Sequence, residues 1–273
     1  MAYKRILTIQ DISCVGQCSM TVALPILSAC GHEVCILPSA VLSTHTGGFG
    51  KPVILNLADQ IDQIWHHWKC AGIMFDAVYT GYLGSIDAIR AAANIMDEMI
   101  VPGGKVIVDP AMADHGKLYN GFDDAYANAM KELCFRADVM IPNITEAAMM
   151  TGMPYLEACD EDYVNSLLNK LGGKDVVLTG TSLESGKTGA VFRTDGNIGY
   201  YSHDRYDRSF HGTGDIFASA FTGALMNGKT LDESVRIAAD FTCESIFQTI
   251  QNPAHWYGVK FETALLALID MLK

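Results

Sequence analysis

The sequence of 273 residues lacks several patterns that would assign a class directly. No segment approaches the roughly 18 uninterrupted apolar residues of a membrane span, and the apolar run within residues 1–10 is too short for a secretory signal. The eight cysteines form no CxxC pair and mostly have apolar neighbours, which favours reduced thiols in the core over disulfides or zinc ligands. These absences predict a cytoplasmic protein without a membrane partner.

Basic residues are few, with 19 Lys and Arg against 31 Asp and Glu and a net charge of -12. The average field around such a protein repels long anionic polymers, so nucleic acid is not an expected partner. A phosphate-bearing ligand would need local neutralisation by backbone N–H groups, a helix N-terminus or a metal ion. Because 49% of the residues are hydrophobic and 18% charged, we expect one folded α/β domain over residues 1–273.

Short β-rich runs alternate with longer stretches of helical period, which predicts a mainly parallel sheet covered by helices on both faces. The predicted strands are 5–10, 33–39, 75–83, 105–110, 138–143 and 175–180. Residues 189–204 have two β-like runs around Asp195-Gly196, which predicts a hairpin and an antiparallel margin. Helices are predicted over 216–228 and 230–250, the second with Thr230 and Glu233 at capping-box spacing.

Several predicted strands end in polar or glycine-containing residues. Ligands of open α/β sheets bind at the carboxyl ends of the strands, so these residues should converge on one crevice. The strand ends in question are Gln10-Asp11, Thr80-Gly81-Tyr82, Asp109-Pro110, Asn143 and Thr179-Gly180.

The glycine-rich turn Gly212-Thr213-Gly214 leads into Asp215 and an apolar stripe at helical spacing. Free N–H groups at a helix N-terminus can hold a phosphate, and glycine lets the backbone approach it. A carboxylate in that first turn is kept ionised by the helix dipole, which suits a base that accepts a proton from an alcohol. The alternative is that Asp215 only caps the helix.

Asp109 and the pair Asn143 and Glu146 offer hard oxygen ligands suited to Mg²⁺ and its waters. Each of these residues alone is also typical of a turn or a helix cap. Their occurrence with Asp215 at three predicted crevice positions favours a shared site.

Other motifs lack the surrounding structure or partner residues that their usual function requires. Residues 223–230 match the Walker A pattern, but a P-loop needs a preceding strand and this stretch has helical spacing. We therefore interpret Gly228 as a helix stop. His66 and His67 have no acidic or cysteine partner at ligand spacing, and no GxGxxG follows the first strand.

Taken together, the motifs resemble the ribokinase superfamily and, within it, the pyridoxal/pyridoxamine kinases, over nearly the whole chain. The glycine turn with Asp215 indicates only the superfamily, whereas two of the segments indicate the vitamin B6 branch. The matching segments are 43–48 (STHTGG) and 80–85 (TGYLGS), which carry the B6 resemblance, with 108–112, 142–146 and 212–215.

The resemblance implies a ribokinase-like kinase that transfers a phosphoryl group from ATP to the 5′-hydroxymethyl group of a B6 vitamer, as a homodimer. Asp215 would be the base, and Gly212, Thr213 and Gly214 the anion hole. Asp109 and Glu146 would organise Mg²⁺, and a monovalent cation is also allowed. The nucleotide-side residues would be Asp109, Tyr119, Asn143, Glu146, Thr179 and Gly180, and the vitamer-side residues Asp11, Ser13, His45, Thr46, Tyr82 and Asp215.

The chain departs from the resemblance at three positions. Asp11 stands where many members have a serine, so the preferred vitamer stays open. Ile141 replaces a threonine and removes one nucleotide contact. Thr213 replaces the cysteine of a branch that also phosphorylates hydroxymethylpyrimidine. The alternatives are a hydroxymethylpyrimidine or sugar kinase on the same scaffold, and a non-catalytic nucleotide- or vitamer-binding protein.

Overall fold

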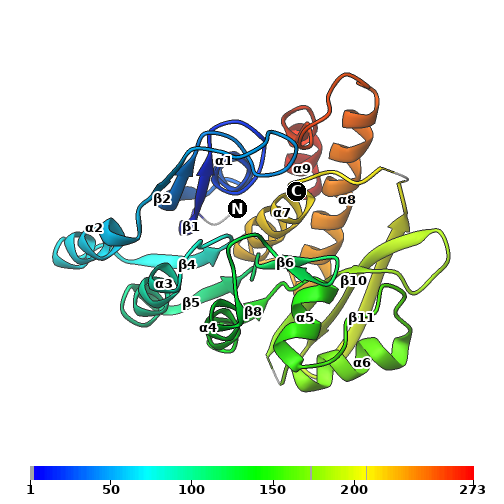
Figure 1. Ribbon diagram of the computed structural model, residues 1–273, viewed down its shortest axis with the longest axis horizontal. Helices are drawn as coiled ribbons and strands as arrows, with labels where there is room; N and C mark the ends of the chain where they lie inside the picture. Colours follow the sequence, from blue (N-terminus) through cyan, green and yellow to red (C-terminus); the bar gives the residue numbers. More distant parts are fainter. Residues whose placement is uncertain (1–2, 173, 207) are drawn as a thin grey trace.

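The computed structural model describes residues 3–172, 174–206 and 208–273, and Figure 1 shows its central sheet with helices on both sides. The nine strands have the order β11-β10-β9-β8-β5-β4-β1-β2-β3, and those from β2 to β9 in this order run parallel. The strands are β1 (Arg5–Ser13), β2 (Glu33–Leu42), β3 (Ile54–Asn56), β4 (Phe75–Thr80), β5 (Ile100–Val108), β8 (Val139–Met140), β9 (Asp175–Thr181), β10 (Lys187–Thr194) and β11 (Asn197–Asp204). The predicted mainly parallel sheet is confirmed.

The antiparallel margin is also confirmed, because β10 and β11 pair around Asp195 and Gly196, which have φ of 49° and 80°. Positive φ at both turn positions matches the right-handed twist of the strands. The second antiparallel edge, β3 against β2, was not predicted, since its three residues are too few to show alternation. The strand predicted over 138–143 is shorter than expected, because Pro142 has no N–H and Asn143 already caps the next helix.

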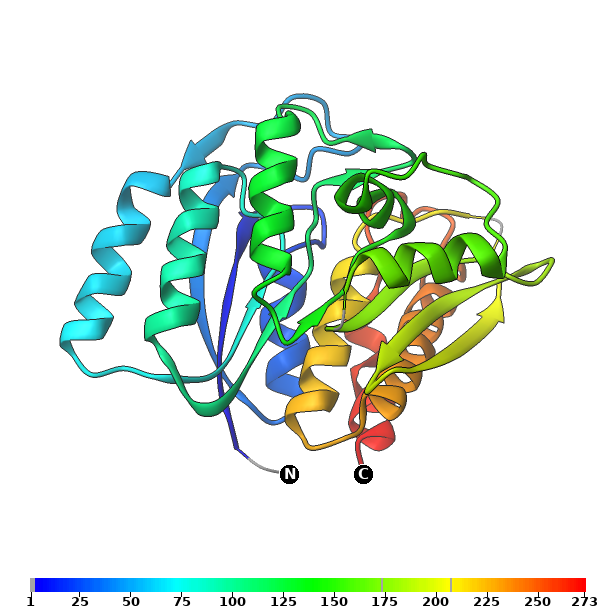
Figure 2. The ribbon, with the colours of Figure 1, turned by 90° about the horizontal axis from the view of Figure 1, so that it is seen from below.

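Two helical layers cover the sheet, and Figures 1 and 2 show them on its opposite faces. Successive side chains of a strand point to opposite faces of the sheet and so contribute to both cores. Ile6 and Ile107 face one helical layer, and Leu7 and Val108 face the other. The first layer holds α1 (Met20–Ala29), α7 (Thr213–Met226), α8 (Leu231–Ile250), η1 (Phe261–Ala264) and α9 (Leu265–Met271). The second layer holds α2 (Ala58–Cys70), α3 (Ile86–Glu98), α4 (Asp124–Cys134), α5 (Ile144–Thr151) and α6 (Glu161–Lys170).

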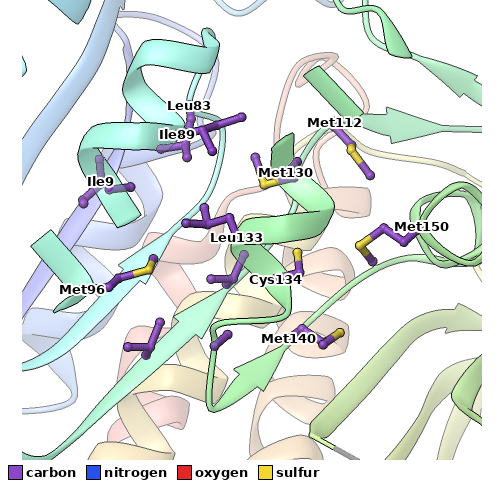
Figure 3. Close-up of a cluster of buried hydrophobic side chains, with 14 of the residues drawn as sticks. Ile9, Leu83, Ile89, Met96, Met112, Met130, Leu133, Cys134, Met140 and Met150 are labelled. Carbon is purple, nitrogen blue, oxygen red and sulfur yellow. The ribbon is translucent and has the colours of Figure 1, made fainter. Parts of the chain in front are cut away.

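The second core is rich in methionine, and Figure 3 labels Met96, Met112, Met130, Met140 and Met150 among its buried side chains. Methionine is unbranched and fills irregular gaps between elements that meet at different angles. Met112 is fully buried there although it lies outside any helix or strand. It anchors the segment after β5, from which the two-stranded ribbon β6 (Ala113–Asp114) and β7 (Lys117–Leu118) continues.

The rejection of the Walker A match is confirmed, because Gly223 lies inside α7, whereas the loop of a P-loop follows directly on a strand. Gly228 has φ of 85° directly after that helix, as expected of a helix stop. Thr230 and Glu233 form the predicted capping box of α8. The lysine and threonine of the match therefore belong to an interhelical turn.

The cysteine prediction holds only in part. All eight thiols are free, and Cys18, Cys30 and Cys134 are buried, but Cys14 and Cys70 are exposed. Over the residues that the structure describes, none of the helices has the length and apolar character needed to cross a membrane.

A substitution at Gly223 tests how closely α7 packs on α1. A Cβ built at Gly223 would lie 2.8 Å from the Cβ of Cys30 and still closer to its Sγ. We expect Gly223→Ala to lower the free energy of unfolding, because overpacking costs about 1–3 kcal/mol, more than the gain of about 0.5–1 kcal/mol from replacing a helical glycine. Urea denaturation measures this, and adding Cys30→Ala should recover part of the loss. A Gly223→Ala variant more stable than the wild type would contradict the packing.

Candidate active site

The predicted site residues come together at the carboxyl ends of the parallel strands. Asp11 and Ser13 end β1, Tyr82 follows β4, Asp109 follows β5, and Thr179 lies near the end of β9. Asn143 is joined to Thr179 by a parallel bridge. The predicted strand ends therefore share one edge of the sheet, and Asp215 in the first turn of α7 lies near enough to Asp109 and Asp11 for their charges to raise its pKa.

Asp215 occupies the first turn of α7, whose N-cap is Gly212 with φ of 82°. Gly212 must be glycine, since a Cβ there would collide with the carbonyl oxygen of Gln17. The first intrahelical bond runs from the N–H of Ile216 to the oxygen of Gly212. The amides of the preceding turn are therefore left for another acceptor, and a Cβ at Gly214 would meet only open space.

The pKa of the Asp215 carboxyl is raised, contrary to the expectation that the helix dipole keeps this group ionised, because burial outweighs the dipole. Burial raises its pKa to about 7, and the negative charges of Asp109 and Asp11 act in the same direction. The backbone N–H of Ser19 opposes this shift by favouring the ionised form. A carboxyl with a pKa near neutrality can take up and release a proton at the working pH of most enzymes.

Glu146, which is buried, and Asp109, which is half-buried, form an acidic pair near Asp215. Oε1 of Glu146 accepts hydrogen bonds from the N–H groups of Met112 (2.9 Å) and Ala113 (3.4 Å), and Oε2 accepts one from Asn143 (2.9 Å). Burial raises the pKa of both carboxyls, and the charge of Glu146 raises that of Asp109 further. Asp109 in turn accepts a hydrogen bond from the N–H of Ala111 at 3.1 Å.

The remaining nucleotide-side predictions surround this pair. Asn143 caps α5, and its Nδ2 donates to the oxygen of Ala113 at 2.8 Å. The side chain of Tyr119 is 40% exposed, but the protein packed around its hydroxyl group and the charge of Glu146 raise its pKa. Thr179 donates its N–H to the oxygen of Pro142, and Gly180 follows it, exposed, with φ of 70°.

The residues predicted to contact the vitamer follow or end β1, β2 and β4, and one of them, Asp11, lies near Asp215. Asp11 is buried and accepts a hydrogen bond from Oγ of Ser13 at 3.0 Å. Burial raises the pKa of Asp11, and the charge of Asp11 adds to burial in raising the pKa of Tyr82. Tyr82 stacks on Phe122 with ring centroids 5.2 Å apart. The aromatic ring of Tyr82 and the carboxyl group of Asp11 thus lie near each other.

His45 and Thr46 belong to the segment after β2. Burial and the neighbouring His211 lower the pKa of His45, whose ring lies 4.9 Å from that of His211. Thr46 is exposed, and within the part of the chain that the structure describes its side chain forms no hydrogen bond with another predicted site residue. Of all the predicted site residues, Thr46 and Gly180 thus interact least with the others.

Three residues near the site were missed by the sequence analysis. Ser19 adopts φ of 51° and places its N–H beside Asp215. Gln17 supports the turn of Gly212 and donates to Glu262 at 2.8 Å, and His211 contacts His45. These contacts join segments far apart in the chain, so only His211, next to the glycine turn, had a local signal.

Two cavities lie outside the acidic pair. One of about 240 Å³ borders the site at Ser13 and is lined by the loop 14–17 with Tyr257 and Glu262. A larger one of about 400 Å³ lies between α3 and α4 on the outer side of the helical layer, away from the carboxylates. The predicted site residues therefore lie at the strand ends and not in the larger cavity.

The match to a known family covers most of this architecture. The sequence profile described as phosphomethylpyrimidine kinase matches residues 56–259, which include Asp109, Glu146 and Asp215. The chain belongs to the phosphomethylpyrimidine kinase family. Its fold is the ribokinase-like fold that the motifs predicted.

The proteins similar to this chain are described as kinases of two kinds of substrate. A hydroxymethylpyrimidine/phosphomethylpyrimidine kinase of Bacillus subtilis is 29% identical over 177 residues, or 64% of this chain and 65% of that protein. A pyridoxine/pyridoxal/pyridoxamine kinase of Bordetella bronchiseptica is 26% identical over 89% of each chain. The crystal structure of pyridoxal kinase from Lactobacillus plantarum superposes with a TM-score of 0.92 at 31% identity, covering 99% of this chain and 98% of that one.

The acidic pair fits a Mg²⁺ ion held mainly through water and phosphate oxygens. Within the described ranges, no three His, Cys, Asp or Glu side chains gather into a metal cage. Both oxygens of Glu146 already accept backbone N–H groups, whereas Asp109 accepts one. Mg²⁺ commonly binds through one or two carboxylates and keeps several waters, so Asp109 has the more suitable donor atoms.

The raised carboxyl pKa values predict how stability depends on pH without metal. Asp215 titrates near 7 in the folded state instead of 3.8, so the folded protein binds more protons than the unfolded chain from about pH 4 to pH 7. The free energy of unfolding should therefore fall as the pH rises through this window. Denaturation in urea and EDTA at several pH values measures it.

Asp109→Asn should flatten that dependence, because it removes one shifted carboxyl and one charge that raises the pKa of Asp215. Asp59→Asn on the exposed surface of α2 is the matched control and should keep the wild-type slope. Equal slopes in the wild type and Asp109→Asn would contradict the mutual repulsion.

Proposed function

We propose that this protein is an ATP-dependent kinase that phosphorylates the 5′-hydroxymethyl group of a vitamin B6 compound. The observation that carries the proposal is the position of Asp215, directly after the free amides at the start of α7 and electrostatically coupled to Asp109. A base, an anion-binding turn and a metal-compatible carboxylate in one crevice are the parts that phosphoryl transfer needs.

In the proposed reaction the Asp215 carboxylate accepts the proton of the substrate hydroxyl as its oxygen attacks the γ-phosphorus. A new P–O bond forms, the bond to the β,γ-bridging oxygen breaks, and ADP leaves. The amides of Thr213 and Gly214 donate to the phosphoryl oxygens as negative charge spreads over them. Because the pKa of Asp215 is about 7, a useful fraction of the carboxyl is ionised at neutral pH.

Asp109 and Glu146 would lie on the nucleotide side of the site. Bound Mg²⁺ supplies charge neutralisation between the phosphates and the carboxylates. Asp109 would take the ion directly or through water, while Glu146 fixes the backbone of Met112 and Ala113 around it. Tyr119, Thr179 and Gly180 would line the nucleotide.

The vitamer would lie on the other side of Asp215, between Asp11 and Tyr82. Tyr82, stacked on Phe122, offers an aromatic face to a pyridine ring. Asp11 offers a buried carboxyl held by Ser13, which favours a pyridinium nitrogen or an amine-bearing substrate. The near-full-length similarity to the Lactobacillus plantarum pyridoxal kinase supports this choice.

The second candidate is a hydroxymethylpyrimidine kinase, favoured by the matched family and by the Bacillus subtilis relative. Both substrates present a hydroxymethyl group on a heteroaromatic ring, so the same base and anion hole serve either. Thr213 in place of a cysteine in the glycine turn favours the B6 compound.

A substrate panel separates these functions. Pyridoxal, pyridoxamine, pyridoxine, hydroxymethylpyrimidine and ribose are incubated with Mg-ATP, and ADP release is followed with product analysis. We expect the highest kcat/KM for a B6 vitamer. Turnover of hydroxymethylpyrimidine alone would replace the proposal by the second candidate, and no turnover of any alcohol would favour a binding protein.

The role of Asp215 is tested by Asp215→Asn, which nearly preserves shape but removes the base. We expect turnover to fall by about 10²-fold or more, the usual scale for a general base. Calorimetry should show the affinity for the vitamer and for ADP much less affected, and Asp59→Asn should behave as the wild type. Unchanged turnover would remove Asp215 from the reaction.

A further inference from the structure

Residues 43–50, here called the 43–50 loop, follow β2 and are docked on three other segments. The N–H of His45 donates to the oxygen of Val15 at 2.7 Å, and the N–H of Gly47 donates to Nδ1 of His45 at 3.0 Å. Phe49 packs on Trp256 and Tyr257, with ring centroids 4.7 Å and 5.2 Å away. The loop is therefore held by side-chain packing as well as by its own backbone.

His211 supplies the third support, and it directly precedes the glycine turn. Its ring centroid lies 4.9 Å from that of His45 at an interplanar angle of 50°. A Cβ on Gly47 would lie 2.8 Å from Cε1 and Nε2 of His211 and 2.9 Å from Cε1 of His45. Gly47 is not among the residues with positive φ, so its lack of a side chain serves this contact rather than the backbone conformation.

We propose that His211 is a positioning residue that packs against His45 and Gly47 and thereby fixes the 43–50 loop relative to the turn of Gly212 to Gly214. The vitamer-side loop and the phosphoryl-binding turn then share one contact, although 166 residues separate His45 from His211 in the chain. This inference rests on the proposed function only for the identity of the two ligands.

The contact suits positioning because the glycine turn is anchored by other contacts, whereas the 43–50 loop has no regular secondary structure. Gly212 is locked against Gln17, and Ile216 is buried in the core, so the turn that carries His211 is fixed. The 43–50 loop has no helix or strand of its own and contains three glycines. Loss of one packing contact should therefore loosen the loop rather than the turn.

Hydrogen exchange tests the contact without any catalytic readout. In His211→Ala, peptides spanning residues 43–50 should exchange faster, while those of α7 stay protected. His67→Ala on the exposed face of α2 is the matched control and should change neither region. Unchanged exchange in the 43–50 loop would overturn the proposal, whatever the substrate of the protein proves to be.

Kinetics then separate positioning from phosphate binding. We expect His211→Ala to lower kcat/KM for the vitamer by about tenfold or more, through a higher KM, since group transfer is sensitive to small misplacements. The KM for ATP should stay near its wild-type value. His211→Phe keeps an aromatic ring and should rescue the vitamer KM. A raised KM for ATP, or a His211→Phe variant as impaired as His211→Ala, would overturn packing as the cause.

Gly47→Ala completes the test. Its methyl group should displace the two imidazole rings and raise the vitamer KM in the wild-type background. In the His211→Ala background the same substitution should have a smaller effect, because one of the two clashes is gone. Strictly additive effects would show that Gly47 and His211 act independently and would contradict the shared contact. If the wild type phosphorylates no B6 vitamer, the proposed function fails while hydrogen exchange still decides this inference.

Discussion

Electrostatic repulsion links Asp109 to Glu146 and to Asp215 at the carboxyl ends of the sheet, and the rest of the site is organised around that repulsion. The charge of Glu146 raises the pKa of Asp109, and the charge of Asp109 raises that of Asp215. Backbone N–H groups offset part of the cost, three at Glu146 and one at Asp109. A protein with a net charge of -12 can accept a polyphosphate at such a place only together with cations.

The two helical layers contribute opposite halves of this arrangement. Helix α7 packs in one core through Ile216 and brings Asp215 with its glycine turn. The other core buries Met112, whose N–H donates to Glu146, and α5, which Asn143 caps. Because the two layers pack against the same sheet, the proposed base Asp215 and the proposed metal ligand Asp109 keep a fixed relation to each other.

Local signals made much of this predictable from the sequence. The glycine turn before Asp215 and the hairpin at Asp195-Gly196 depend on neighbours a few residues away, so their patterns sufficed. The ring of donors around Glu146 was not predictable, because the N–H groups of Met112 and Ala113 come from 34 and 33 residues earlier. Likewise, the β3 edge has three residues and no readable period, and the His45 and His211 contact requires tertiary packing.

The rejected Walker A match shows why letters alone do not define a phosphate site. Gly223 fits the pattern, but its backbone lies inside α7, where N–H groups are already bonded along the helix and its missing side chain makes room for Cys30. Gly212 and Gly214 match no P-loop, yet they lie where a helix begins and N–H groups have no partner within it. Since an anion is bound by unpaired donors at the positive end of the dipole, position relative to the helix start decides the function of each glycine.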